Sequence, residues 1–474
     1  MIADLKPYPA MKDSGVPWLG EVPEHWEIER LKARAANIIE QTDERPSGGL
    51  YVALEHVESW TGRLRDAGSE TSFESQVKRF RPDDVLFGKL RPYLAKVARP
   101  TREGVCVGEF FVLRSTANGV GADYLARLLR SKSIIDTIDA STFGAKMPRA
   151  DWHFVGNLAL SFPPLPEQAS IVRFLDHADR RIRRCIRAKQ RLIKLLEEQK
   201  QAIIHSAVTR GLDPNVRFKP SGVEWLGEVP EHWKVKRLKN VSPGITVGVV
   251  VNPSSYFQET GVPILLGNNV LPGRFRLDEV RRISPESNEA LRKSQLRTGD
   301  VVVVRVGAPG VAAVITDELD GCNCASMVIV RRGRDYEPRW MEHLFNSAVM
   351  RRQIDVVKYG AAQKQFNIAH AVEFLAILPS IEEQRLILIQ LEGELAAQEA
   401  AISVTHREIS LLREYRTCLI ADVVTGKLDV RAAAARLPDE TDESEAPDDS
   451  EGLADGDEDT TDGDLGAAQE EAEA

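Results

Sequence analysis

The chain has 474 residues, a length that predicts two to four domains. Of these residues 43% are hydrophobic and 28% charged, proportions typical of a globular protein. No apolar run approaches the ~18 residues needed to span a bilayer, and the first fifteen residues lack the apolar core of a secretory signal. The five cysteines are odd in number and scattered, so they favour reduced thiols over a disulfide framework or a zinc site. These features exclude an integral membrane protein and predict a cytoplasmic one.

The formal net charge of −9 conceals two oppositely charged parts. Residues 438–474 contain 17 Asp or Glu and no Lys or Arg, whereas the preceding 437 residues contain 62 basic and 54 acidic residues, a net charge of about +8. A basic body is compatible with a nucleic-acid partner. The acidic end has too little apolar surface to offset the entropy of ordering, so it predicts a disordered tail.

The sequence contains an internal repeat. Residues 14–32 (SGVPWLGEVPEHWEIERLK) and residues 221–239 (SGVEWLGEVPEHWKVKRLK) are identical at fifteen of nineteen positions, and we call each a leading segment. Further along, Glu167-Gln168 corresponds to Glu383-Gln384 at an offset of 216 residues, which persists to the end of the second copy. Because self-similarity of this kind marks a duplicated structural unit, we expect two domains of one fold.

After its leading segment, each copy has a variable region with short β-branched runs and Gly/Pro turns, which indicates mixed α/β structure. A long helix then closes each copy, with proline before it and acidic residues in its first turn. Both helices carry apolar residues at alternating spacings of three and four, over about five heptads, which predicts a coiled coil. The two apolar seams consist of Val172, Leu175, Ile182, Ile186, Ile193, Leu196 and Ile203, and of Leu388, Leu391, Leu395, Ile402, Ile409, Leu412 and Leu419.

The predicted fold is therefore mixed α/β (α+β), with two globular domains separated by a long two-helix coiled coil and related as an internal pseudo-twofold repeat. The predicted boundaries are 1–162 for the first domain, 163–210 for the first helix, 211–378 for the second domain, 379–430 for the second helix and 431–474 for the disordered acidic tail. The alternative is that each helix packs only on its own globular domain.

Complete catalytic motifs are missing from the sequence. There is no phosphate-binding G-x-x-x-x-G-K-[ST] loop, and Asn252-Pro253 is followed by serines rather than by the rest of a methyltransferase N-P-P-[YF] signature. Pro82-Asp83 and Lys89 resemble part of a nuclease site, but the residue two before Lys89 is Phe87 rather than an acid. His25 and His232 recur beside tryptophans without a cysteine or carboxylate triad, which favours packing or hydrogen-bonding roles. We therefore predict a non-catalytic chain.

Binding chemistry is better represented, because both variable regions contain clusters of Arg and Lys. Such residues bind phosphates, and Arg also reads guanine edges while Gln reads adenine edges. Two loops at equivalent positions, 144–149 and 360–365, combine small residues with amide and cationic groups. The candidate DNA-binding residues are Lys78, Arg79, Arg81, Lys89, Arg91, Tyr93, Lys146 and Arg149 in the first copy, and Arg274, Arg276, Arg281, Arg282, Arg305, Gln363, Lys364 and Gln365 in the second. Each could instead be a solvated surface charge.

The duplicated leading segment, the stretch Leu86–Leu94 (LFGKLRPYL) and the stretch Pro163–Gln168 (PPLPEQ) before a long helix resemble the specificity subunit of type I restriction-modification systems. The resemblance covers roughly residues 11–430 and excludes the acidic tail. It implies two target-recognition domains that each read one half of a split, asymmetric site in double-stranded DNA. It also implies that the two long helices form an antiparallel coiled coil, which sets the separation of these domains. It also implies docking to modification (methyltransferase) subunits and to restriction/translocase subunits, which would carry S-adenosylmethionine, ATP and Mg, with no cofactor bound to this chain directly.

Two alternatives differ in class from this interpretation. One is a coiled-coil scaffold that pairs protein partners without reading DNA. The other is a fused restriction-modification enzyme, which the missing methyltransferase and nuclease motifs disfavour.

Overall fold

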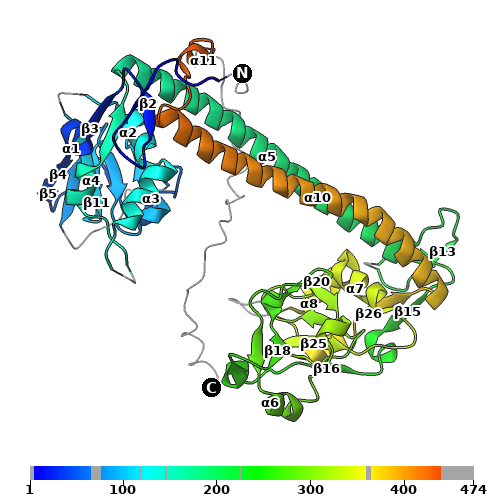
Figure 1. Cartoon of the computed structure of the whole chain (residues 1–474). Helices are drawn as coiled ribbons and strands as arrows, with labels where there is room; N and C mark the ends of the chain where they lie inside the picture. The colour runs from blue at the N-terminus through cyan, green and yellow to red at the C-terminus, as the bar shows by residue number, and fades with distance from the viewer. Residues whose placement is uncertain are drawn as a thin grey trace. The chain divides into compact units, whose positions relative to one another are not determined.

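The computed structural model describes residues 5–65, 76–116, 119–144, 147–224, 226–358 and 365–438. The chain forms two compact units, the first made of residues 1–182 and 414–474 and the second of residues 183–413 (Figure 1). Both are mixed α/β, and two domains are joined by two long helices, so the predicted fold class is confirmed. The acidic residues 439–474 lie outside the described residues, so the prediction of disorder there stays a prediction.

The first unit contains two four-stranded sheets. The strand orders are β4-β11-β8-β9 and β5-β7-β10-β6, with antiparallel pairing except between β10 and β6. Every residue of β8 is buried, as expected for a strand rich in β-branched and aromatic residues. The bounds are β4 Ala35–Ile38, β5 Gln41–Thr42, β6 Leu50–Val52, β7 Val77–Phe80, β8 Val85–Gly88, β9 Val97–Ala98, β10 Gly104–Cys106 and β11 Phe110–Ser115.

The second unit repeats this plan in its sheets β16-β25-β22-β23 and β17-β21-β18-β24. The valine run of β22 is buried throughout and corresponds to β8 at the offset of 216. The bounds are β16 Ile245–Val247, β17 Phe257–Gln258, β18 Val262–Leu265, β21 Arg281–Ile283, β22 Val301–Val304, β23 Ala312–Val314, β24 Asn323–Cys324 and β25 Met327–Val330. A small hairpin, β19 Val270–Leu271 with β20 Arg274–Phe275, is present in this unit.

In each unit the chain returns to its leading segment before the long helix begins. The antiparallel pairs are β3 (Glu27–Arg30) with β12 (Ala159–Phe162) and β15 (Lys234–Arg237) with β26 (Leu375–Leu378). Shorter leading hairpins precede them, namely β1 Met11–Asp13 with β2 Glu21–Pro23 and β13 Phe218–Pro220 with β14 Glu228–Pro230. The shorter helices are α1 Leu31–Arg34, α2 Ala122–Leu129, α3 Lys132–Ala140 and α4 Trp152–Asn157, then α6 Pro285–Ala290, α7 Pro338–Asn346, α8 Ala348–Val357 and α9 Ile368–Ala371.

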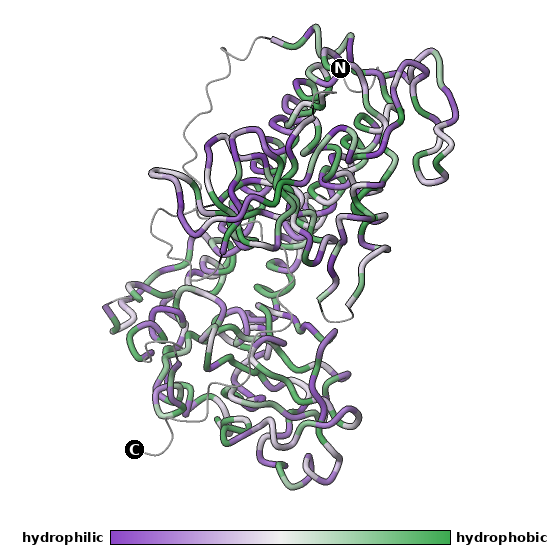
Figure 2. Tube along the Cα trace, turned by 90° about the vertical axis from the view of Figure 1, so that its left-hand side faces the viewer, coloured by the Kyte–Doolittle hydropathy of each residue, from purple (hydrophilic) through white to green (hydrophobic). Residues whose placement is uncertain are grey.

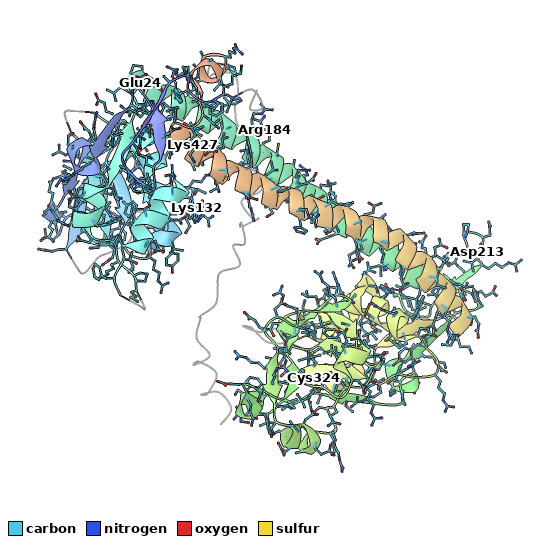
Figure 3. The ribbon with its side chains drawn as sticks, in the orientation of Figure 1. Glu24, Lys132, Arg184, Asp213, Cys324 and Lys427 are labelled. Atoms are coloured by element: carbon cyan, nitrogen blue, oxygen red, sulfur yellow. The ribbon has the colours of Figure 1, made fainter. Side chains whose placement is uncertain are left out.

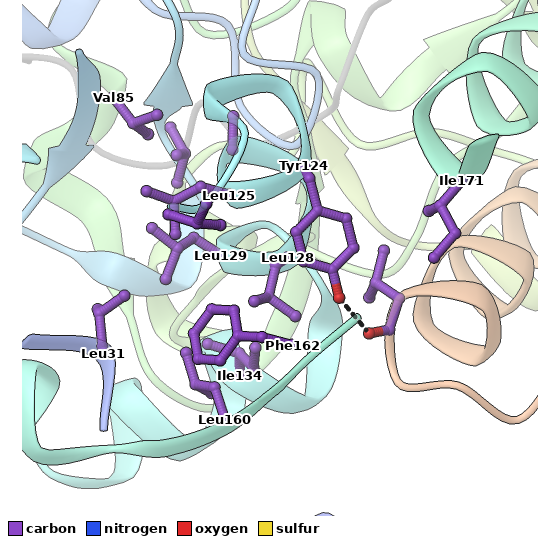
Figure 4. Packing of buried hydrophobic residues seen from close by; sticks show 14 of the residues in the cluster. Leu31, Val85, Tyr124, Leu125, Leu128, Leu129, Ile134, Leu160, Phe162 and Ile171 are labelled. Atoms are coloured by element: carbon purple, nitrogen blue, oxygen red, sulfur yellow. Dashed lines mark hydrogen bonds between the residues drawn. The ribbon is translucent and has the colours of Figure 1, made fainter. Parts of the chain in front are cut away.

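The core of the first unit joins the globular part to the ends of both long helices. Tyr124 on α2 is fully buried, and its hydroxyl donates to the carbonyl oxygen of Val424 at 3.2 Å (Figure 4). Ile171 and Phe174 near the start of the first long helix belong to the same cluster. Apolar contacts of this density stabilise the unit mainly by removing hydrocarbon surface from water.

The two long helices are α5 (Leu165–Arg210) and α10 (Ile381–Val424). Each helix carries seven of the fourteen predicted seam residues, and none of the fourteen is exposed. Three interhelical ion pairs join the helices: Asp179–Arg416, Lys189–Glu408 and Lys200–Glu399. Along these pairs the residue number increases on α5 and decreases on α10. The pairing is therefore antiparallel, as the resemblance implies (Figure 1).

The leading segments fasten the first turn of each long helix. In the first unit Glu167 accepts hydrogen bonds from the Tyr8 hydroxyl at 2.6 Å and the Trp26 indole at 3.0 Å, and it pairs with His25 at 2.7 Å. In the second unit Glu383 accepts from the Trp233 indole at 3.0 Å and pairs with His232 at 2.9 Å. The recurring histidines therefore have the hydrogen-bonding role that the sequence indicates.

The glutamines beside these glutamates close the junction with the globular part. Gln168 accepts from the backbone of Gly121 at 2.8 Å and donates to the carbonyl of Pro163, and Gln384 makes the corresponding bonds to Glu337 and Pro379. The Glu-Gln pair thus has the same role in both copies: the glutamate binds side chains of the N-terminal part of its copy, and the glutamine satisfies backbone groups where strand and helix meet.

The boundary of 431 for a disordered tail was placed too early. Residues 431–435 form helix α11 (Arg431–Ala435), whose Ala434 is buried in the core of the first unit, and the Arg431 guanidinium lies 5.0 Å from the centre of the Tyr8 ring. The acidic composition begins after Pro438, and the short alanine-rich stretch before it is apolar enough to pack.

Hydrophobic and hydrophilic residues are interleaved along the trace of both units (Figure 2). Consistent with this pattern, the described residues include no helix whose length and apolar character would let it cross a membrane.

Candidate nucleic-acid interface

The residues that follow strand β8 form a basic surface in the first unit. Lys89 comes directly after the buried strand, and its carbonyl accepts from the backbone of Ala150 at 2.8 Å. Leu90 pairs with Arg149 as an isolated antiparallel bridge, and the Arg91 amide donates to the Pro148 carbonyl at 2.8 Å. The backbone therefore holds residues 89–91 beside residues 148–150, although they are nearly sixty residues apart in sequence. We call this surface the β8 surface.

Aromatic and apolar side chains stand out from the same surface. Tyr93 is 44% exposed, Phe143 63% and Met147 54%. Arg91 has a φ of 50°, a left-handed conformation that is uncommon outside glycine and that strained functional loops often contain. Exposed rings beside cations suit contact with the sugar and base edges of a nucleic acid. Phe143 and Met147 were not predicted as site residues; the only sequence signal was that Met147 lies within the loop 144–149 and Phe143 directly precedes it.

The carboxylate of Glu109 partly neutralises the positive charge of the β8 surface. Arg149 forms an ion pair with Glu109 at 3.0 Å, and the other carboxylate oxygen of Glu109 is buried without a hydrogen-bond partner among the described residues. Lys89 and Arg91 form no ion pair within the described part of the chain, and Arg91 is exposed. Arg149 is thus held in place by the protein, while Arg91 remains available to an anion.

The second unit presents the same arrangement after strand β22. Val306 forms an isolated bridge with Gln365, and these residues correspond to Leu90 and Arg149 at the offset of 216. Arg305 corresponds to Lys89, and its Nε is buried with no hydrogen-bond partner in the described ranges. A buried donor without an acceptor is costly, so an incoming acceptor there would gain more than an ordinary surface contact. We call this the β22 surface.

The two surfaces share a backbone plan but differ in the groups that they carry. The first has Lys89, Arg91 and Arg149, and the second has Arg305, Gly307 and Gln365 at the matching positions. Cations are replaced by a glycine and an amide in two of the three places. The chemistry that each surface can recognise therefore differs, which is what two independent readers require.

Lys78 was predicted as a DNA contact, and the structure contradicts this. The side chain lies on β7, is 8% exposed, and donates to the carbonyl of Phe110 at 2.7 Å. Desolvation by burial, and then the charge of Lys89, lower the pKa of Lys78. Its role is to satisfy a backbone carbonyl inside the unit, because the strand turns this position inward.

The other basic residues of the first copy lie away from the β8 surface. Arg79 is on β7 in the other sheet and is 3.4 Å from Glu103, and Arg81 lies before β8 rather than after it. In the second copy Arg274 is on the hairpin strand β20 and Arg276 follows it, while Arg281 and Arg282 are on β21, with Arg282 donating to the Gly261 carbonyl at 2.8 Å. Lys146, Gln363 and Lys364 lie outside the described residues.

The nuclease-like stretch has a structural explanation. Asp84 is buried, accepts from the Arg81 amide at 2.8 Å and binds the Arg114 guanidinium through both oxygens. Asp300 is also buried, accepts from the Arg297 amide and binds the Arg331 guanidinium through Oδ2, while its Oδ1 accepts from the Arg332 amide. The described residues also contain no group of three His, Cys, Asp or Glu side chains arranged to hold a metal ion. The two aspartates therefore have a structural role in the turns directly before strands β8 and β22.

Together, the fold and the repeated surfaces define a class, an internally duplicated binding protein with two units joined by a coiled coil. No family model matches the chain. It is 23% identical over 304 residues to the type I restriction enzyme EcoBI specificity subunit of Escherichia coli, covering 62% of this chain and 63% of that subunit. It is also 23% identical over 438 residues to the putative type I restriction enzyme MjaX specificity subunit of Methanocaldococcus jannaschii, covering 87% of this chain and 96% of that one.

The matches differ in extent, since the chain spans less than two thirds of the EcoBI subunit and 36% of the EcoDI specificity subunit of Escherichia coli. Among solved structures, a chain from a study of complex assembly and conformational transition of the type I R-M system matches with a TM-score of 0.64 and 21% identity. That match covers 86% of this chain and 99% of the other. The relatives confirm the resemblance to type I restriction-modification specificity subunits, and the solved structure confirms the fold.

Proposed function

We propose that this chain chooses the DNA target of a type I restriction-modification enzyme, with each unit reading one half of a bipartite, asymmetric site. The chain would act by binding and leave methyl transfer and cleavage to partner subunits. Support comes from the names of the relatives and from the basic surplus of the body.

The observation that carries the proposal is the pair of matching bridges, Leu90 with Arg149 and Val306 with Gln365. One backbone plan presents two different sets of side chains. Arg91 and Arg149 suit guanine edges or phosphates, whereas Gln365 suits an adenine edge. A duplicated reader with changed reading groups recognises two unlike half-sites, which gives an asymmetric target.

Partner docking is the second element of the proposal. The outer face of α10 exposes Leu386 (65%), Ile389 (70%), Val404 and Leu411, although the apolar seam of this helix is already covered. Apolar side chains gathered on an exposed face favour a protein interface. Modification subunits with S-adenosylmethionine, and restriction/translocase subunits with ATP and Mg, are the partners that the resemblance implies.

The test is a map of adenine methylation in the host genome with the gene deleted and complemented by variants of the intact chain. Removing Arg91 and Arg149 together should relax one half-site only. Removing Arg305 and Gln365 should relax the other. A well-placed bidentate base contact is worth about 1–3 kcal/mol, so discrimination at the affected position should fall about 5- to 150-fold.

A matched control is Arg79→Ala, which removes one exposed cation from the other sheet of the first unit and should leave the methylation map unchanged. If neither double variant changes the map while complex assembly depends on Ile389, the chain is a coiled-coil scaffold without DNA readout. Loss of both half-sites from one double variant would exclude independent readers.

A further inference from the structure

Helix α5 carries a stripe of basic side chains along one side. Alternating spacings of four and three residues place its members on one face of the helix. The stripe consists of Arg173, His177, Arg180, Arg184, Arg187, Arg191 and Lys194. Within residues 180–194 there are eight Lys or Arg and no Asp or Glu. A random mixture of surface residues does not give seven basic positions on one helix face together with a stretch, residues 180–194, that contains no acidic residue.

The stripe does not face the partner helix. The seam of α5 runs through Ile182, Ile186 and Ile193, and the stripe residues occupy the other side of the heptad, as Arg184 illustrates in Figure 3. Arg184, Arg187, Arg191 and Lys194 are exposed. In the described ranges, no carboxylate pairs with Arg187, Arg191 or Lys194.

The coiled coil itself does not require this charge. At the offset of 216, the residues of α10 that match the last five stripe positions are Ala396, Ala400, Ser403, Arg407 and Ser410. Only one of these is a cation, although six of the seven apolar seam residues of α5 have an apolar seam counterpart on α10 at this offset. A feature present in one copy alone points to an occupant that also occurs once.

The acidic C-terminal segment occurs once, and it starts at the head of the stripe. The Arg173 guanidinium donates to the carbonyl oxygens of Leu437 at 2.9 Å and Pro438 at 3.1 Å, the last described residues before that segment. Helix α11 and its contact with Tyr8 fix this exit point on the first unit. The chain that follows contains 17 carboxylates in residues 439–474 and no Lys or Arg.

Its length is sufficient to follow the stripe. From Arg173 to Lys194 the helix rises about 32 Å at 1.5 Å per residue. A flexible chain of 36 residues has an end-to-end distance of about 30–36 Å, and an extended one reaches about 120 Å. Opposite charges tethered at so short a distance meet at high effective concentration.

We infer that residues 439–474 bind the basic stripe of α5 in the same chain. The 17 carboxylates of the segment outnumber the seven basic residues of the stripe, so the occupied coiled coil of the intact chain offers little to other polyanions. A nucleic-acid backbone and this segment are competitors for the same guanidinium groups, and the tethered segment has the advantage of proximity.

Zero-length carbodiimide cross-linking of the intact chain tests the proposal, because Lys194 is the only amine on the stripe. We expect amide bonds between Lys194 and carboxylates of residues 439–474, mapped by mass spectrometry after cleavage at acidic residues. The bond between Lys189 and Glu408, whose Nζ and Oε2 lie 2.6 Å apart, is the internal positive control. Raising NaCl from about 50 to about 500 mM should reduce the Lys194 product severalfold and the control much less.

The triple variant Arg184→Gln, Arg187→Gln and Arg191→Gln should lower the Lys194 product at least fivefold while keeping the Lys189–Glu408 bond. The matched control, Arg102→Gln, Arg217→Gln and Arg292→Gln, removes three exposed cations elsewhere and should change neither product by more than twofold. Exposed glutamines on the surface of a formed coiled coil leave the fold intact, which the retained Lys189–Glu408 bond verifies.

A second measurement separates the acidic segment from DNA as the occupant. Replacing its carboxylates by amides in the full chain should raise affinity for a duplex that lacks any recognition site, and the stripe triple variant should abolish that gain. Equal cross-linking of the segment to all exposed lysines, including Lys234 and Lys293, would overturn the proposal. So would a stripe variant that weakens duplex binding while the Lys194 product is unchanged, since the stripe would then serve the DNA backbone.

Discussion

Replacing Glu167 by alanine should destabilise the first unit more than Glu383→Ala destabilises the second, although the two residues are the same position of the repeat. Glu167 is buried and accepts from Tyr8, Trp26 and His25, of which Tyr8 and Trp26 are buried. Glu383 has no counterpart of Tyr8, and its side chain is 30% exposed.

The magnitude follows from the donors left behind. A buried donor without an acceptor costs about 1–3 kcal/mol, so two buried donors give about 2–6 kcal/mol for Glu167→Ala. Water can reach the groups around Glu383, so Glu383→Ala should cost about 1–2 kcal/mol. For a unit of about 200 residues, 1 kcal/mol corresponds to roughly 2–4 °C in Tm. Glu167→Gln keeps one acceptor oxygen and should lie between alanine and the native residue.

Chemical denaturation gives the total loss, and hydrogen exchange measured on peptides of each unit assigns it. We expect faster exchange around α2 and β12 in Glu167→Ala, and around α7 and β26 in Glu383→Ala. Equal losses from the two alanine variants would refute the reasoning, because the structure attributes the difference to Tyr8 and to burial.

Three further outcomes are expected. Burial, and then nearby Arg and Lys charges, lower the pKa of His343 to about 4, below its unfolded value near 6.5. Stability from neutral His343 is therefore present above pH 6.5 and is lost as pH falls towards 4, by about 2–3 kcal/mol, and His343→Gln should flatten this acid limb in urea titrations. Lys78→Met should change DNA affinity of the assembled enzyme less than twofold, whereas Lys89→Met should weaken it severalfold in an anisotropy titration. Asp179→Ala should cost about 3 kcal/mol because it removes a buried carboxylate from the half-buried Arg416, whereas Lys189→Ala, which breaks a more exposed pair, should cost less than about 1 kcal/mol by thermal denaturation.

Local sequence patterns predicted those parts of the site whose residues lie close together along the chain. Lys89, Arg91 and Tyr93 follow one buried strand, so a motif read in order finds them. Phe143 and Met147 reach the same surface only because the bridge between Leu90 and Arg149 closes a loop of nearly sixty residues. Lys78 shows the opposite failure, because a cation in a basic run was taken to face solvent while its strand turned it inward.

The sequence by itself determined the duplication, the mixed α/β class and the coiled coil. These follow from repeated residues and from heptad spacing, since apolar seams must be covered. The antiparallel orientation does not follow from the heptads; the resemblance implies it, and the ion pairs between the helices show it. Only the tertiary structure decided which cations gather at the ends of β8 and β22 and which, like Lys78, donate a hydrogen bond to a buried carbonyl. The order of residues fixes the spacing along one element, whereas contacts between distant elements depend on how the strands pair and which side chains the core accepts. The exit of the acidic segment at the head of the α5 stripe is of this second kind, because it depends on α11 packing against the first unit.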